Sequence, residues 1–196
     1  DCANVLARGH RRLRSTTTLL RLPMSNHLDA WIQTYPDFPK PGILFYDIAP
    51  IIEHADRLST VCELIRDAID EWQPDVLVGI DSRGFLFATP VALMMDLGVV
   101  MVRKQGKLPG NVLEKSYALE YGEATLAVQK DRDLKGKRVV LIDDLLATGG
   151  TLAATESLIN DSGAQVVGTV VLIELQLLKG RSHLQAPVKS LQVYDE

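Results

Sequence analysis

The stretch that most constrains this chain is residues 139–151, VVLIDDLLATGGT. Its apolar start predicts a buried strand whose carboxyl end falls at Asp143 and Asp144, and ligands of open parallel sheets bind beyond that end. Adjacent carboxylates are not buried without partners, because desolvating an unpaired charge costs several kcal/mol. We therefore expect both to face solvent or a ligand rich in hydrogen-bond donors.

The second half of the same stretch predicts an anion site. A segment that opens a helix follows the carboxylates, and it consists of Ala147, Thr148, Gly149, Gly150 and Thr151. Its amides, its hydroxyls and the positive end of the helix dipole favour a phosphate, and the glycines let the backbone approach it. Carboxylates for a sugar diol beside amides for a phosphate imply a ribose 5-phosphate. The plain alternative is a turn capped by Asp144 or Thr148. The stretch fits neither the Walker loop nor the dinucleotide fingerprint.

Apolar runs alternate with helical patterns along the chain, and this alternation predicts an α/β fold. Strands are expected at 75–80, 99–102, 139–142 and 166–173, and helices at 28–35, 55–72, 84–97 and 151–162. Continuous apolar strands separated by helices indicate a parallel sheet buried on both faces. Residues 117–129 alternate like an antiparallel pair turned at Gly122, which suggests an insertion over one edge of the sheet. Residues 183–196 fit no motif.

Size and charge narrow the class of protein. A chain of 196 residues is long enough for one core, and its net charge of -4 argues against nucleic acid as the main partner. The longest apolar stretches are strand-sized, well below the roughly 18–20 residues of a membrane span. Cys62 lies in an apolar helical pattern and is expected to be a buried thiol rather than disulfide-bonded to Cys2.

The first 23 residues differ from the rest, since they carry five arginines against the single acid Asp1. Such a leader is either an organelle transit peptide or a non-native leader that precedes a natural start at Met24. We favour the second interpretation. The expected division is a basic leader over 1–23 and a single domain over 24–196.

The stretch at 139–151 resembles the phosphoribosyl pyrophosphate signature of the type I phosphoribosyltransferases. The resemblance covers roughly residues 36–182, and four further segments match the branch of the family that uses adenine. They are FPKPGILFYDIAP at 38–50, GIDSRGFLF at 79–87, RKQGKLPG at 103–110 and SYALEYG at 116–122. The resemblance implies a central, mainly parallel sheet flanked by helices, with a small hood and a flexible β-hairpin loop.

The family resemblance also implies an activity. It is transfer of the 5-phosphoribosyl group from phosphoribosyl pyrophosphate to adenine, a pentosyl transfer of purine salvage that gives AMP and pyrophosphate. Mg²⁺ would be held mainly through substrate and water, with no direct protein ligand. The expected assembly is a homodimer in the cytoplasm, without nucleic acid or membrane partners.

A second loop is expected to bind the pyrophosphate. Asp81, Ser82, Arg83 and Gly84 follow a strand, as the family's diphosphate loop does, and the resemblance implies a strained peptide between Asp81 and Ser82. A guanidinium forks onto phosphate oxygens. Because a helix start disfavours a cation, an anionic partner explains Arg83 better than a bare surface position does.

Arg103, Lys104 and Lys107 lie around a turn, and by themselves they indicate a solvated basic loop. The resemblance implies instead that they contact the pyrophosphate, with Arg103 reaching that of a neighbouring subunit. Gln105 stands where the family often has a further basic residue, so a lower affinity for pyrophosphate is expected.

The base site rests on the resemblance alone. Glu120 is an ordinary hairpin residue and Phe45 a core residue by pattern. The family's catalytic loop makes Glu120 the acid or base at the purine N7, with Tyr121 helping that loop to close. Phe45 would stack on the base, next to the main chain of Leu44 and Tyr46. The family commonly has arginine where Tyr46 stands.

Two rival functions stay open at this point. One is a 6-oxopurine specificity for hypoxanthine, guanine or xanthine, with Lys179 or Lys189 recognising the oxo group. The other is a non-catalytic regulator that senses phosphoribosyl pyrophosphate. Such regulators usually carry a DNA-binding module, and residues 1–23 are too few for one.

Overall fold

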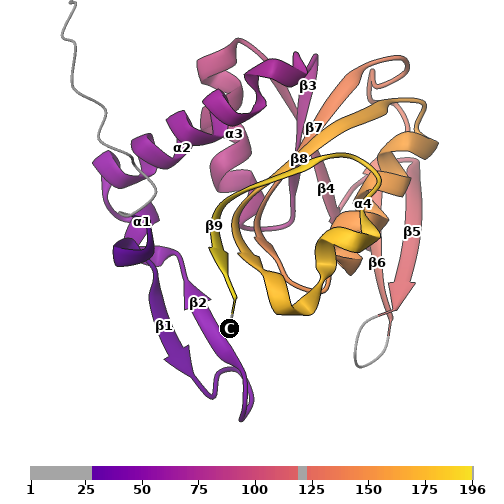
Figure 1. The fold of residues 1–196 in the computed structure, drawn as a ribbon. Coiled ribbons are helices and arrows are strands. Elements are labelled where there is room, and N and C mark those ends of the chain that lie inside the picture. The colour runs from indigo at the N-terminus through magenta and orange to yellow at the C-terminus, as the bar shows by residue number, and fades with distance from the viewer. Residues whose placement is uncertain (1–27, 119–122, 196) are drawn as a thin grey trace, which may run out of the picture.

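The structure is a computed structural model that describes residues 28–118 and 123–195. The expected leader at 1–23, and Glu120 and Tyr121 of the predicted catalytic loop, lie outside the described residues. A seven-stranded sheet of order β5-β6-β4-β3-β7-β8-β9 forms the centre, and a separate two-stranded hairpin, β1-β2, stands beside it (Figure 1).

The central sheet is mainly parallel, which confirms the predicted α/β class. Strands β3, β4, β7, β8 and β9 run parallel to one another, while β5 and β6 form an antiparallel pair that joins the edge at β4. The strands are β1 (Gln33–Pro36), β2 (Leu44–Asp47), β3 (Val76–Ile80), β4 (Gly98–Lys104), β5 (Val112–Ala118), β6 (Glu123–Gln129), β7 (Arg138–Leu146), β8 (Gln165–Leu175) and β9 (Val188–Tyr194).

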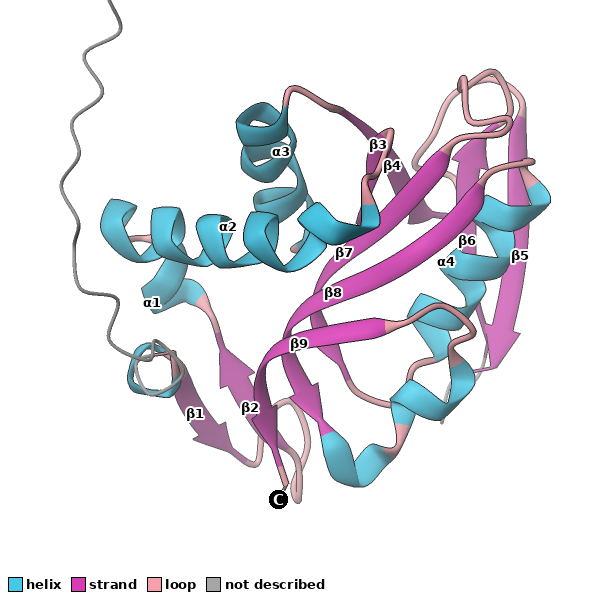
Figure 2. Ribbon diagram, turned by 45° about the horizontal axis from the view of Figure 1, so that its top comes forward, coloured by secondary structure: helices cyan, strands magenta, loops and turns pink. Residues whose placement is uncertain are grey.

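Helices cover both faces of the sheet. On one face lie α2 and α3, and on the other lies α4 (Figure 2). The helices are α1 (Ala49–Ile52), α2 (Ala55–Ile69), α3 (Gly84–Met95) and α4 (Gly150–Asp161), with 3-10 turns η2 (Asp29–Trp31), η3 (Asp70–Trp72), η4 (Gln176–Leu178) and η5 (Gly180–His183). None of the helices in the described part of the chain has the length and apolar character that a membrane span requires.

The core explains why the central strands are apolar throughout. Successive side chains of a strand point to opposite faces. In β7, Val140 and Ile142 therefore pack with α2 and α3, while Val139 and Leu141 pack with α4. The thiol of Cys62 in α2 is free and buried in the first of these layers, as predicted.

The structure corrects three expectations. Residues 28–35 are not one helix: a 3-10 turn at Asp29–Trp31 precedes strand β1, which pairs with β2. Strand β7 does not end at Asp143 but continues to Leu146, because β8 pairs with it along this length. The segment without a motif forms β9, the far edge of the sheet. In each case pairing with a distant strand decides the structure.

Candidate functional site

A cleft of about 460 Å³ opens at the carboxyl ends of β3 and β7. The carboxylate pair, residues of both predicted anion loops and the last residue of β4 line it. They are Asp81, Ser82, Arg83, Lys104, Asp143, Asp144, Ala147, Thr148, Gly149, Gly150 and Thr151. Segments about 60 residues apart in sequence therefore meet at one edge of the sheet, where ligands of such sheets bind.

Arg83 joins the carboxylate pair to the diphosphate loop. Its Nε lies 2.8 Å from Oδ2 of Asp144, whose side chain is only 8% exposed. Asp143 accepts a hydrogen bond of 2.9 Å from the backbone N–H of Asp144. Asp144 lines the cleft but is largely shielded from solvent, and Arg83 supplies the partner that its charge requires.

Burial changes the titration of both carboxyl groups. Desolvation raises the pKa of Asp143 well above its usual value, and the neighbouring charge of Asp144 raises it further. Desolvation also raises the pKa of Asp144, although the Arg83 guanidinium opposes that change. Two carboxylates held this close favour a ligand that brings positive charge or hydroxyl donors.

Asp143→Asn is expected to stabilise the ligand-free protein at neutral pH. The folded-state pKa of Asp143 lies above the unfolded value, so the free energy of unfolding falls as pH rises from about 4 through the folded pKa. Asparagine does not ionise, so it removes this fall in the free energy of unfolding, and its side-chain oxygen still accepts the hydrogen bond from the Asp144 N–H. We expect the melting temperature to rise by a few degrees at pH 7.5 and to stay unchanged near pH 3.5. Thermal unfolding of both proteins across this pH range is the measurement, with the exposed Asp161→Asn as control.

The loop at 81–84 lies between β3 and α3. The peptide bond between Asp81 and Ser82 is cis, and Arg83 is the residue that caps α3. A Cβ atom on Gly84 would lie 2.6 Å from the carbonyl oxygen of Ile142, so only glycine lets this loop approach β7. Arg103 lies within 3.0 Å of the Asp81 carboxylate through its Nε, and so belongs to the rim of the same loop.

The hood hairpin β1-β2 brings an aromatic ring to Arg83. The guanidinium carbon of Arg83 lies 5.8 Å from the ring centroid of Phe45, and Phe38 packs against Phe45 edge-on at 5.1 Å. Phe45 therefore lies beside the cleft, in the region predicted for a base. The Tyr46 side chain instead packs into the core, where its ring stacks on Tyr194 at 4.3 Å. Alternation along β2 thus gives these neighbours different surroundings.

The remaining predicted residues lie at different distances from the cleft. Leu44 is exposed on the hairpin, and Lys107 lies on the turn after β4, where its carbonyl accepts a 3.4 Å hydrogen bond from Arg103. Lys189 lies away from the cleft, since its ammonium contacts the Ala68 carbonyl at 2.7 Å and the Trp72 ring. Lys189 is thus not placed to recognise a 6-oxo group.

Tyr117 is a lining residue that sequence reasoning missed. Its hydroxyl lies 3.0 Å from Oγ1 of Thr151, and a Cβ atom on Gly150 would lie 3.3 Å from its ring. Tyr117 is the second-last residue of β5, a strand whose side chains alternate between the two faces of the sheet, so its sequence pattern is that of any tyrosine in a sheet. Only the packing of β5 against α4 brings Tyr117 to the loop at 147–151.

Comparison with known proteins identifies the family. The phosphoribosyl transferase domain matches residues 48–193. The chain belongs to the phosphoribosyltransferase family. An adenine phosphoribosyltransferase of Gluconobacter oxydans is 51% identical to this phosphoribosyltransferase over 174 residues, which are 89% of the present chain and 97% of the relative.

Solved structures agree with this assignment. The adenine phosphoribosyltransferase of Thermoanaerobacter pseudethanolicus superposes with a TM-score of 0.84 at 40% identity, covering 87% of this phosphoribosyltransferase and 99% of its own chain. That of Saccharomyces cerevisiae, solved with adenine and an imino-altritol bisphosphate, gives 0.81 at 38% identity and covers 85% and 97%. The type I phosphoribosyltransferase fold expected from the sequence is confirmed.

Proposed function

We propose that this phosphoribosyltransferase transfers the phosphoribosyl group of phosphoribosyl pyrophosphate to adenine, giving AMP and pyrophosphate in purine salvage. The observation that carries the proposal is the convergence of two anion loops on one carboxylate pair in a single cleft. A ligand with a phosphate, a sugar diol and a diphosphate matches the loop at 147–151, the carboxylate pair and the loop at 81–84, respectively. The adenine-specific relatives, one of them holding adenine, support the choice of base.

Each end of the substrate has its own group of residues. The amides of the loop at 147–150 and the start of α4 bind the 5-phosphate. Asp143 and Asp144 orient the ribose hydroxyls and stabilise the positive charge that develops on the sugar as pyrophosphate leaves. Residues 81–84, with Lys104 and Lys107, bind the pyrophosphate. Arg103, which pairs with Asp81 of its own chain here, would leave that carboxylate in the dimer to reach the pyrophosphate of the neighbouring subunit.

The base is placed by the hood. Phe45 stacks on adenine, and the main chain of Leu44 and Tyr46 supplies the carbonyl and amide for its Watson–Crick edge. N9 then attacks C1′ from the face opposite to the pyrophosphate. Glu120 acts as acid or base at N7, and Tyr121 helps the catalytic loop to exclude water that would hydrolyse the activated ribose.

The donor set of the cleft fits Mg²⁺ bound mainly through substrate. Among the described residues no cluster of three or more His, Cys, Asp or Glu side chains is placed to hold a metal ion. Mg²⁺ typically keeps several waters and binds substrate phosphates, so the ion would be held through the diphosphate and water, with no direct protein ligand. When bound, the ion neutralises the leaving pyrophosphate.

A homodimer in the cytoplasm is part of the proposal. Helix α3 and the adjoining β4 expose a group of large apolar side chains, whose exposed fractions are 44% for Leu86, 78% for Leu93, 42% for Met94 and 46% for Met101. Exposed apolar groups of this kind mark protein contacts. We expect Leu93→Glu to convert a dimer to monomers in light scattering, whereas Leu177→Glu, on an exposed leucine of η4, leaves the mass unchanged.

The proposed reaction is tested with radiolabelled adenine and phosphoribosyl pyrophosphate, with and without Mg²⁺, and with hypoxanthine and guanine alongside. We expect magnesium-dependent formation of AMP from adenine alone. Turnover of a 6-oxopurine in place of adenine would overturn the base assignment. Binding of phosphoribosyl pyrophosphate without turnover of any base would favour the alternative function, a non-catalytic regulator that senses phosphoribosyl pyrophosphate.

A further inference from the structure

The segment at 179–183, between β8 and β9, packs backbone to backbone against the loop at 147–150. We call it the Gly180 buttress. A Cβ atom on Gly180 would lie 2.1 Å from the carbonyl oxygen of Ala147 and 2.8 Å from the amide nitrogen of Gly149. A Cβ atom on Gly149 would in turn lie 2.4 Å from the carbonyl oxygen of Gly180. Since real Cβ atoms do not approach this closely, the contact requires glycine on both sides.

A histidine of the buttress forms a hydrogen bond with one peptide group of the loop at 147–150. The Nδ1 atom of His183 lies 2.8 Å from the carbonyl oxygen of Thr148. A carbonyl oxygen only accepts, so Nδ1 carries the hydrogen and donates it. The C=O and N–H of one trans peptide point in opposite directions. A Thr148 carbonyl held by His183 therefore turns the N–H of Gly149 away from the buttress, which leaves it for a ligand in the cleft.

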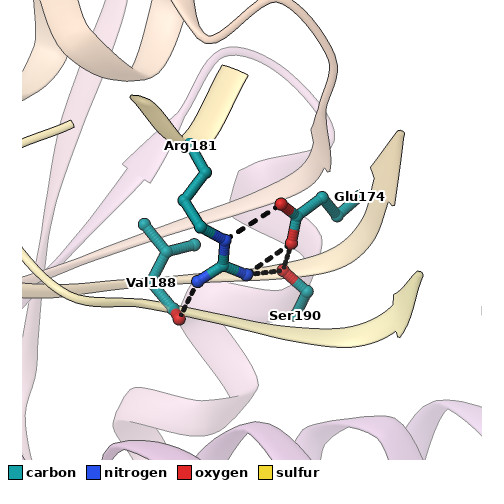
Figure 3. A network of polar contacts seen from close by, with 4 residues as sticks. All are labelled: Glu174, Arg181, Val188 and Ser190. Carbon is teal, nitrogen blue, oxygen red and sulfur yellow. Dashed lines mark hydrogen bonds and ion pairs between the residues drawn. The ribbon is translucent and has the colours of Figure 1, made fainter. Parts of the chain in front are cut away.

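Arg181 anchors the buttress to the sheet (Figure 3). It donates to Oε1 of Glu174 through Nε at 3.0 Å, to the Val188 carbonyl through Nη1 at 2.6 Å and to Oγ of Ser190 through Nη2 at 3.1 Å. Ser190 also donates to Glu174. Glu174 lies on β8 and the other two partners on β9, so one guanidinium fixes the buttress to both strands.

Glu174 and Arg181, the ion pair that anchors the buttress, are both charged at neutral pH. The Glu174 side chain is 7% exposed, and the hydrogen bonds from Arg181 lower its pKa below the usual range despite the desolvation. The pair is bidentate and charge-assisted, so it has a defined geometry even though the Arg181 side chain is 47% exposed. The buttress is thus a stiff element, and the loop that it touches is the one that must present amides to a phosphate.

We propose that Gly180 and His183 are positioning residues for the 5-phosphate of the phosphoribosyl substrate. They act through the backbone of the loop at 147–150 and do not touch the reacting atoms. The inference rests on the proposed function, because it takes this loop to be the phosphate site. It assigns a role in substrate affinity to a segment outside the cleft lining.

The proposal predicts a selective change in substrate affinity. In His183→Ala we expect KM for phosphoribosyl pyrophosphate, and the Kd for ribose 5-phosphate measured by calorimetry, to rise about tenfold, as for the loss of one hydrogen bond. KM for adenine and kcat should change less than about twofold. His183→Asn, which keeps a donor near the position of Nδ1, should restore both constants to within about threefold of the unmodified protein.

His54→Ala is the matched control. His54 also lies within hydrogen-bond distance of a backbone carbonyl through Nδ1, at 3.1 Å from Pro50, but it follows α1, outside the cleft lining. We expect this variant to keep every constant within about twofold. Gly180→Ala provides a second route: it should raise the same constants by more than His183→Ala, whereas Gly98→Ala, where a Cβ meets no atom within 4 Å, should not.

The outcomes separate the two proposals. Equal constants in His183→Ala and His54→Ala would overturn the buttress while leaving the phosphoribosyl transfer intact. A rise in all constants together, or one that His183→Asn does not reverse, would reduce the segment to a structural support and also overturn it. If the unmodified protein neither forms AMP nor binds ribose 5-phosphate, the proposed function itself fails. Should Gly180→Ala not fold, the His183 variants still decide.

Discussion

Asp144→Asn is expected to lower kcat/KM for phosphoribosyl transfer by about 10²–10³, or about 2–4 kcal/mol of transition-state stabilisation. The carboxylate is buried and ion-paired to Arg83, so its charge acts in a site of low dielectric close to the developing cation. Asparagine keeps the size and an acceptor oxygen but removes that charge. The measurement is the steady-state rate of AMP formation at saturating adenine.

The fold is expected to survive this substitution. Arg83 is 38% exposed, so water solvates its guanidinium once the partner charge is gone. Asp161→Asn is the matched control, because Asp161 is an aspartate paired with Lys115 at 3.4 Å on the solvent-exposed surface. We expect that control to stay within about twofold, as for other surface pairs. A rate for Asp144→Asn as high as that of the control would remove Asp144 from the proposed mechanism.

Arg83→Lys is expected to lower kcat/KM for phosphoribosyl pyrophosphate by roughly 30- to 100-fold, about 2–3 kcal/mol, with little change in KM for adenine. Lysine keeps the positive charge but lacks the planar fork that matches a diphosphate. The same guanidinium faces both Asp144 and the Phe45 ring, so a flexible ammonium also orders the cleft less well. Initial rates with either substrate varied give the two constants.

Arg83→Met adds a pH signature to the same position. The Arg83 charge lowers the pKa of Asp144, so its removal raises that pKa further. The acid limb of the pH–rate profile should therefore shift to higher pH, because more of the carboxyl group is protonated at a given pH. Arg57→Lys is the control, since Arg57 also lies over an aromatic ring, Trp31 at 5.7 Å, outside the cleft lining. For the first of these variants, Arg83→Lys, an unchanged kcat/KM for phosphoribosyl pyrophosphate would contradict the assignment of Arg83 to the pyrophosphate.

The place of the two loops and of the carboxylate pair at the sheet edge could be predicted from sequence because each segment is contiguous in the chain, while their anion-binding roles stay a prediction. A strand, its carboxyl end and the following helix start form a unit whose pattern is local. Residues 81–83 and 143–151 accordingly lie in one cleft, since both groups stand at or beyond the carboxyl ends of the parallel strands β3 and β7. The helix α2 likewise follows from apolar periodicity, α3 from its apolar composition, and the parallel sheet from continuous apolar runs separated by helices.

Contacts between segments far apart in sequence could not be predicted in this way. Even within one hairpin the pairing was missed: β1 was mistaken for helix, since its four residues acquire strand geometry only by pairing with β2. The burial of Asp144 depends on Arg83, which lies on another element. Tyr117 and Gly180 have ordinary patterns and gain their contacts with the loop at 147–151 only from packing.

The α/β class, the family resemblance and the residue pattern of the loops depend on neighbours along the chain, so they can be predicted from the sequence. The tertiary structure decided which charges are paired, which ring lies beside Arg83 and what holds the anion loop in place. Those features depend on strand pairing and on close packing of backbones, which no local pattern encodes.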